Sequence, residues 1–328
     1  MTRNIAPTGL DRRRFLGGAA GLTTLFGLAA CGVGAGDDET DAPGAGGEGG
    51  AGERTVAADN GEITVPEHPE RVIVTDNYGV WMLFDVGLVP VGVPEGTALP
   101  AVLPEDIYEA IRDTTTIGVP GEPNAQAVAT LEPDLILDQF YEEKTRELAT
   151  IAPVVYFNWA DSGSLWHEQA ERVADAVNRA DRLAAVRTEY RDRLAEVRDA
   201  YADQIAASTW APVSGGPNGT FFLGSPLLSV MRDLGLTIGA GLPEDEAGFV
   251  EKSYEELDIL QDCTVLVYPE LFDGTLAAPT AELVANPLWA GLDPVVAERA
   301  FPVRHYGVGS YRFANGAVDE IEAILDRL

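Results

Sequence analysis

The chain is poor in cysteine, in histidine and in positive charge. Its 328 residues include 2 cysteines, 3 histidines and 22 lysines and arginines against 53 aspartates and glutamates, for a formal net charge of −31. The low cysteine count excludes a disulfide framework, and three histidines disfavour a site for a free metal ion, which needs about four converging His and carboxylate ligands. The negative charge makes nucleic acid and anionic membrane surfaces poor partners.

A hydrophobic run long enough to cross a membrane is also missing. As a helix, residues 15–30 would be about 24 Å long, short of the roughly 30 Å hydrocarbon core that a spanning helix must cross. This segment follows the arginine cluster DRRRFL at residues 11–16 and leads into Leu28-Ala29-Ala30-Cys31. A charged region, an apolar region and small residues in this order are typical of an export signal. DRRRFL resembles the twin-arginine type, and LAAC resembles a bacterial lipobox, in which cleavage exposes a cysteine that is then lipidated.

We therefore expect residues 1–30 to be a twin-arginine lipoprotein signal peptide and Cys31 to carry the lipid. Residues 31–53 are rich in glycine and acidic residues and almost free of large apolar side chains, which predicts a flexible linker. The remaining thiol, Cys263, precedes an apolar run and is interpreted as a buried bystander.

From residue 54 onward, short apolar runs alternate with helical patterns, which predicts an α/β fold. A hairpin is expected around the Asn-Gly pair at residues 60–61. The other expected strands are Val72–Thr75, Val89–Val93, Thr115–Gly118, Leu135–Asp138, Val154–Phe157, Trp210–Val213, Thr220–Leu223, Thr264–Tyr268 and Ala300–Val303.

The segment from about residue 165 to 205 is wholly helical in pattern, and its second part would be roughly 39 Å long, which suits a helix joining two lobes. The alternative is a pair of consecutive core helices within one domain. We expect two Rossmann-like α/β lobes joined by one long helix: an N-terminal lobe at residues 54–178, an interlobe helix at 179–206 and a C-terminal lobe at 207–328.

An ordered set of motifs resembles the iron-siderophore and vitamin B12 substrate-binding proteins of ABC importers, the class III periplasmic binding proteins. The motifs are HPERVIV at residues 68–74, GLVPVGV at 87–93, GEPN at 121–124, LEPDLI at 131–136, IAPVVY at 151–156, SYEEL at 253–257 and NPLW at 286–289. The resemblance spans about residues 55–328 and implies a shallow ligand cleft between two lobes, and docking on a membrane permease.

A ferric siderophore is a rigid chelate whose iron is already ligated, so its receptor needs aromatic surfaces and a few hydrogen-bond donors, not metal ligands or catalytic residues. Ligands of open α/β sheets bind beyond the carboxyl ends of the strands. The candidate ligand-binding residues in such loops are Tyr78, Tyr141, Trp159, Phe222, Phe272, Tyr306 and Arg312. The alternatives are that an aromatic residue only packs between helix and sheet and that Arg312 forms a surface salt bridge. Trp81 and Trp166 lie in helical patterns and are expected in the core.

In the family, one acidic residue on each lobe contacts basic residues of the permease. Glu255 of the Ser-Tyr-Glu string matches in the second lobe. In the first lobe, where the family often has Asn-x-Glu, this chain has Gln126, so Glu122 or Gln126 is the candidate there.

The resulting hypothesis is a non-enzymatic, lipid-anchored protein on the outer face of the cell membrane that captures a ferric siderophore and delivers it to an ABC permease. A receptor for cobalamin or haem with the same fold is the alternative. An exported metal-ion binder is disfavoured because the chain has too few histidine ligands, and an exported hydrolase is disfavoured because the chain has no Gly-x-Ser-x-Gly nucleophile motif.

Overall fold

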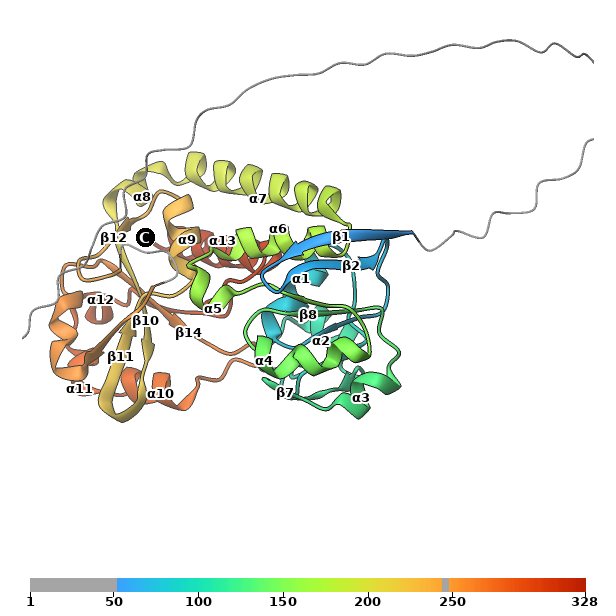
Figure 1. Ribbon diagram of the computed structural model, residues 1–328. Helices are drawn as coiled ribbons and strands as arrows, with labels where there is room; N and C mark the ends of the chain where they lie inside the picture. Colours follow the sequence, from blue (N-terminus) through green and yellow to red (C-terminus); the bar gives the residue numbers. More distant parts are fainter. Residues whose placement is uncertain (1–51, 244–247) are drawn as a thin grey trace, which may run out of the picture. The chain divides into compact units, whose positions relative to one another are not determined.

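The computed structural model describes residues 52–243 and 248–328 (Figure 1). The expected signal peptide, Cys31 and nearly all of the expected linker lie outside the described residues.

Five parallel strands form the first sheet, in the order β5-β4-β3-β8-β9. Strands β3 and β8 are buried along their whole length, which explains why they appear in the sequence as unbroken apolar runs. The strands are β3 (Val72–Val74), β4 (Gly92–Val93), β5 (Thr115–Thr116), β8 (Leu135–Asp138) and β9 (Val154–Tyr156). The other elements of this lobe are α1 (Asn77–Asp85), α2 (Glu105–Ile111), the short pair β6 (Gly118–Val119) and β7 (Glu122–Pro123), α3 (Ala125–Thr130), α4 (Glu142–Thr145), the 3-10 helix η1 (Arg146–Thr150), α5 (Trp159–Ser162) and α6 (Trp166–Ala176).

The expected hairpin is present as β1 (Glu53–Ala58) and β2 (Gly61–Pro66), and its turn covers the free edge of β9. The Asp59 N–H donates to the Tyr156 carbonyl at 2.9 Å. The Asn60 side chain donates to the Val154 carbonyl at 2.9 Å and accepts from the Tyr156 N–H at 3.2 Å. These backbone groups of β9 face away from β8, so the turn satisfies the polar groups that the edge of the sheet leaves open.

The second sheet has the order β13-β11-β10-β14-β15, with β12 also paired to β10. Strands β10, β14 and β15 are parallel, whereas β11 and β13 are antiparallel to their neighbours. The strands are β10 (Thr209–Gly215), β11 (Thr220–Leu223), β12 (Thr237–Ile238), β13 (Val250–Ser253), β14 (Val265–Pro269) and β15 (Ala300–Val303). The helices are η2 (Pro217–Gly219), α9 (Leu227–Asp233), η3 (Tyr254–Leu260), α10 (Ala278–Val284), α11 (Pro287–Ala290), α12 (Asp293–Val296) and α13 (Tyr311–Leu325).

The long helix α7 (Ala180–Ala200) follows the first lobe and leads into the short helix α8 (Ala202–Ala207) (Figure 1). The buried face of α7 contains Leu183, Tyr190, Leu194 and Val197, at the three- and four-residue spacing seen in the sequence. The largest hydrophobic cluster joins these residues to strand residues of both sheets. The lobes therefore share one core along this helix.

Several elements differ from the sequence-based expectations. Strand β4 is limited to two residues because Pro90, which has no N–H to donate, lies inside the expected strand. The expected interlobe helix at 179–206 is interrupted at Tyr201, between α7 and α8. The short strands β12 and β13 carry no clear alternating pattern and were not predicted.

Candidate functional site

Eight aromatic rings form a continuous series that crosses from one lobe to the other, and we call it the aromatic row. Neighbouring ring centroids along the row are 4.1–6.1 Å apart, so each ring is in direct contact with the next. In order, the row comprises Tyr141, Phe140, Trp159, Tyr78 and Trp81 of the first lobe, then Phe313, His305 and Phe272 of the second.

The buried carboxylate of Asp138 positions the outer end of the row. Its Oδ1 accepts the N–H groups of Phe140 and Tyr141, both at 3.1 Å, and its Oδ2 accepts the Thr145 hydroxyl at 2.7 Å. Asp138 is the last residue of β8, so these bonds turn the chain sharply at the carboxyl end of the strand. Two aromatic side chains of the row are thereby held on a rigid strand end.

Asp76 has the same role at the carboxyl end of β3. Its Oδ1 accepts the Gly79 N–H at 2.8 Å, which caps α1 and orients Tyr78 on the first turn of that helix. Burial raises the pKa of Asp76 to about 7, although the hydrogen bond from Gly79 opposes the shift. Burial, together with the neighbouring Asp76 carboxyl, also raises the pKa of Tyr78.

The row crosses between the lobes at Trp81 and Phe313, whose rings stack with centroids 4.1 Å apart and an interplanar angle of 18°. Gly309 permits this approach, because a Cβ there would lie 2.3 Å from the ring of Tyr78.

Asp85, at the end of α1, reinforces the crossing by accepting the N–H groups of Tyr311 at 2.7 Å and Arg312 at 3.0 Å. These are the first two residues of α13, so a carboxylate of one lobe caps a helix of the other. Ser310 completes the cap by accepting the Phe313 N–H at 3.3 Å. Burial raises the pKa of Asp85 to about 7.

A hollow of about 560 Å³ lies between the two lobes at the second-lobe end of the row. One wall is the segment that ends in α2, including Glu105, Tyr108 and Glu109. The other consists of loops after β14 and β15, including Phe272, Asp273, Arg304, His305 and Glu320 of the facing α13. A hydrogen bond of 2.8 Å from the Phe272 N–H to the Ala101 carbonyl joins the two walls. The hollow lies beyond the carboxyl ends of the strands, where open α/β sheets bind ligands.

The structure brings together four of the seven sequence-predicted ligand-binding residues. Tyr78, Tyr141 and Trp159 belong to the first-lobe half of the aromatic row, and Phe272 ends it in the second lobe.

The other three residues lie elsewhere. Tyr306 is only 8 % exposed, and burial raises the pKa of its phenol. Phe222 is half-buried and pairs with the exposed Phe249 at 5.4 Å between centroids. Arg312 forms an ion pair with Asp106 of α2, so it adopts the salt bridge that was the alternative to ligand binding. This ion pair joins the two lobes.

The three candidate docking residues are all exposed. Glu122 lies on β7, with an oxygen 3.9 Å from Lys144 Nζ, and Gln126 lies in the first turn of α3. Glu255 lies in the first turn of η3 and lines a hollow of about 230 Å³ beside the exposed Leu288.

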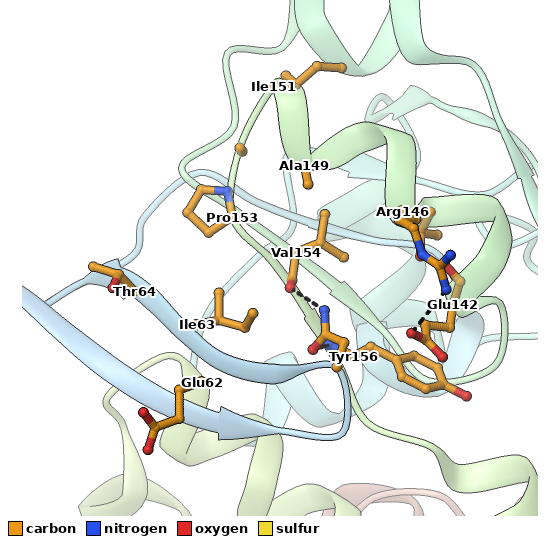
Figure 2. Close-up of a pocket in the computed structure, with 13 residues that line it drawn as sticks. Glu62, Ile63, Thr64, Glu142, Arg146, Ala149, Ile151, Pro153, Val154 and Tyr156 are labelled. Carbon is orange, nitrogen blue, oxygen red and sulfur yellow. Dashed lines mark hydrogen bonds and ion pairs between the residues drawn. The ribbon is translucent and has the colours of Figure 1, made fainter.

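A separate hollow of about 660 Å³ lies between β2 and the α4–η1 segment (Figure 2). Ile63, Pro153 and Val154 supply apolar surface, while Glu142 and Arg146 pair with each other across 3.5 Å. None of the sequence-predicted site residues lines it.

Sequence reasoning did not identify Trp81 or Phe313 as members of the aromatic row, and Phe313 is buried, only 2 % exposed. Trp81 was expected in the core, but it is half-buried and stacks on the other lobe. Both rings lie inside helices, so their positions in the chain gave no sign of a strand-end loop. Trp166 does lie in the core, where it donates to Ser229 at 2.8 Å.

Cys263 is buried, as interpreted from the sequence, and burial raises the pKa of its thiol to about 12, which keeps it unreactive. Within residues 52–243 and 248–328, no three His, Cys, Asp or Glu side chains converge as metal ligands. No helix among these described residues is long and apolar enough to span a bilayer.

Two α/β lobes that share a core along one long helix and meet along an aromatic row define a class III binding protein. Residues 72–238, about half of the chain, match the sequence profile of the periplasmic binding protein family, and the chain belongs to that family. It is a family of binding proteins, so the expectations of fold and of a non-enzymatic protein are confirmed.

Individual relatives agree with this assignment. The chain is 28% identical to the siderophore periplasmic binding protein from the fuscachelin gene cluster of Thermobifida fusca, over 80% of this chain and 99% of that one, with a TM-score of 0.68. Two Bacillus subtilis proteins are each 33% identical: the putative ABC transporter substrate-binding lipoprotein YhfQ over 31% of this chain, and the probable siderophore-binding lipoprotein YfiY over 36%. These alignments cover only about a third of the two curated relatives' own lengths, 32% and 36%.

Proposed function

We propose that the chain is an extracytoplasmic, lipid-anchored receptor that binds a ferric siderophore between its lobes and delivers it to an ABC importer permease. The observation that carries the proposal is the aromatic row, which runs from strand-end loops of one lobe to those of the other beside a hollow between them. A compact chelate with a largely organic outer face is the kind of ligand that such a surface recognises.

The relatives support the same ligand class. The Thermobifida fusca protein and YfiY are described by their names as siderophore-binding, and YfmC of Bacillus subtilis, 27% identical over 104 residues, as Fe(3+)-citrate-binding. YhfQ and YfiY are also named as lipoproteins, which supports lipidation at Cys31. Export by the twin-arginine route rests on the DRRRFL motif alone.

The proposed permease contacts are Glu122 or Gln126 on the first lobe and Glu255 on the second. Their exposure supports this role, since a docking residue has to be reachable by a basic partner.

Fluorescence titration of the soluble protein tests the ligand class. Trp81 and Trp159 lie in the aromatic row, so a ferric chelate bound there should quench their emission. Ferric hydroxamates, ferric catecholates, ferric citrate, haem and cobalamin form the panel. We expect at least one ferric siderophore to bind with Kd below about 10 µM, or about −7 kcal/mol. Tight binding of haem or cobalamin alone would select the alternative receptor, and no binding by any of them would refute the proposal.

A further inference from the structure

The hollow between the lobes carries an excess of negative charge. Its lining includes four carboxylates, Glu105, Glu109, Asp273 and Glu320, but only two basic side chains, Arg304 and His305. The acidic residues come from both walls. A ligand entering between the lobes therefore meets carboxylates on either side.

The basic side chains at this site already lie beside protein carboxylates. Arg304 Nε lies 2.9 Å from Glu270, and His305 Nδ1 lies 3.4 Å from Glu320. Just beyond the lining, Arg312 pairs with Asp106. An anionic chelate would have to compete with these carboxylates for Arg304 and Arg312, and the competition would leave a carboxylate unpaired.

Two of the lining carboxylates, by contrast, have no ion-pair partner among the described residues. Glu105 begins α2 on the first-lobe wall, and Asp273 lies on the facing loop after β14. Asp273 accepts the Thr275 hydroxyl at 2.6 Å and its N–H at 2.9 Å, and these bonds lower its pKa. Asp273 therefore remains ionised at neutral pH.

We propose that the site selects a ferric siderophore bearing a positively charged group, such as a primary ammonium, which lies in the hollow between Glu105 and Asp273. Tyr108 and Phe272 line the same hollow, and an aromatic ring attracts a cation that lies over its face. This inference rests on the proposed siderophore function and further specifies that the bound siderophore carries a positive charge. It predicts that polyanionic chelates such as ferric citrate and ferric tris-catecholates are poor ligands.

A pair of chelates that differ by one charge provides the test. Ferrioxamine B is a linear ferric trihydroxamate with a free ammonium group, and its N-acetyl derivative is the same chelate with that charge removed. At low ionic strength we expect the ammonium form to bind about 5–10-fold more tightly, because two rim carboxylates each contribute a weak, partly screened attraction. The difference should shrink in 0.5 M NaCl, where the screening length is only a few ångströms.

Substitutions show which carboxylates cause the preference for ferrioxamine B over its N-acetyl derivative. Glu105→Gln and Asp273→Asn should each reduce this preference, and the double substitution should abolish it. The affinity for the N-acetyl chelate should stay within about 2-fold of that of the unsubstituted protein. Glu189→Gln, an exposed carboxylate on α7, is the matched control and should leave the preference unchanged.

The outcomes separate this inference from the proposed function. Equal or tighter binding of the N-acetyl form, a preference unchanged by the double substitution, or tighter binding of ferric citrate or ferric enterobactin would overturn the charge selection while the siderophore function stands. If neither ferrioxamine nor either anionic chelate binds below about 10 µM, the charge selection fails, and the proposed function fails with it only if no other ferric siderophore of the panel binds either.

Discussion

Replacing Asp85 with alanine should destabilise the protein by removing a helix cap that one lobe supplies to the other. The carboxylate accepts the N–H groups of Tyr311 and Arg312 at 2.7 and 3.0 Å, and Asp85 is only 7 % exposed. A helix-capping contact contributes about 1 kcal/mol, and a buried donor left without an acceptor costs about 1–3 kcal/mol. Because the vacated space lets water reach part of the helix end, we expect a loss of about 2–4 kcal/mol in the free energy of unfolding at pH 5.5.

Urea unfolding followed by far-UV circular dichroism measures this loss by linear extrapolation. Asp293→Ala serves as the control, because Asp293 is exposed and makes no side-chain contact with the other lobe among the described residues; we expect a change within about 0.5 kcal/mol. If Asp85→Ala costs no more than this control, the contact between α1 and the start of α13 does not stabilise the fold.

Four further predictions concern Asp85, Gly309, Glu255 and Cys31. The folded-state pKa of Asp85, about 7, exceeds its unfolded value, so the native state binds an extra proton between about pH 4 and 7 and this group's stabilisation is lost as the pH rises through that window. Asp85→Asn should therefore reduce the fall in unfolding free energy between about pH 4 and 7. An unchanged slope over that range would contradict the raised pKa of Asp85. Gly309→Ala should cost about 1–3 kcal/mol, since its Cβ would lie 2.3 Å from the Tyr78 ring, whereas Gly307→Ala, with nothing within 4 Å, should be neutral in the same denaturation assay. Glu255→Ala should lower siderophore uptake in cells and leave the Kd of the purified protein within 2-fold; a loss of affinity would instead assign Glu255 to ligand binding. Cys31→Ala should release the protein from the membrane fraction into the soluble fraction with unchanged ligand affinity, and retention in the membrane would refute lipid anchoring at that residue.

The sequence predicted the elements that are either fully buried or strongly periodic. Strand β8, at Leu135–Asp138, has the expected bounds, because an interior strand of a covered parallel sheet is a short, unbroken apolar run. Strand β15, at Ala300–Val303, also has the expected bounds, although it is an edge strand in which only Phe301 and Val303 are buried. Helix α7 was recognisable from its apolar stripe, but the interruption at Tyr201 has no signal as strong as Pro or Gly.

The aromatic row was only half predictable. Tyr141 and Trp159 lie in the segments that follow β8 and β9, so the general position of binding loops identified them as candidates. The stacking of Trp81 on Phe313 joins residues 232 positions apart, and the capping of α13 by Asp85 joins residues of different lobes; nothing in the local pattern specifies such pairs. The pairing of Arg312 with Asp106 likewise depends on which carboxylate the fold brings within reach, in a chain with 53 of them.

The hairpin turn over β9 also affects how copies of this protein behave when they are crowded together. A bare edge strand offers a row of N–H and C=O groups with which a second chain can pair. Asp59 and Asn60 occupy the outward-facing groups of Val154 and Tyr156 within the same molecule. A second copy therefore finds these groups already occupied and cannot extend the sheet by pairing with them.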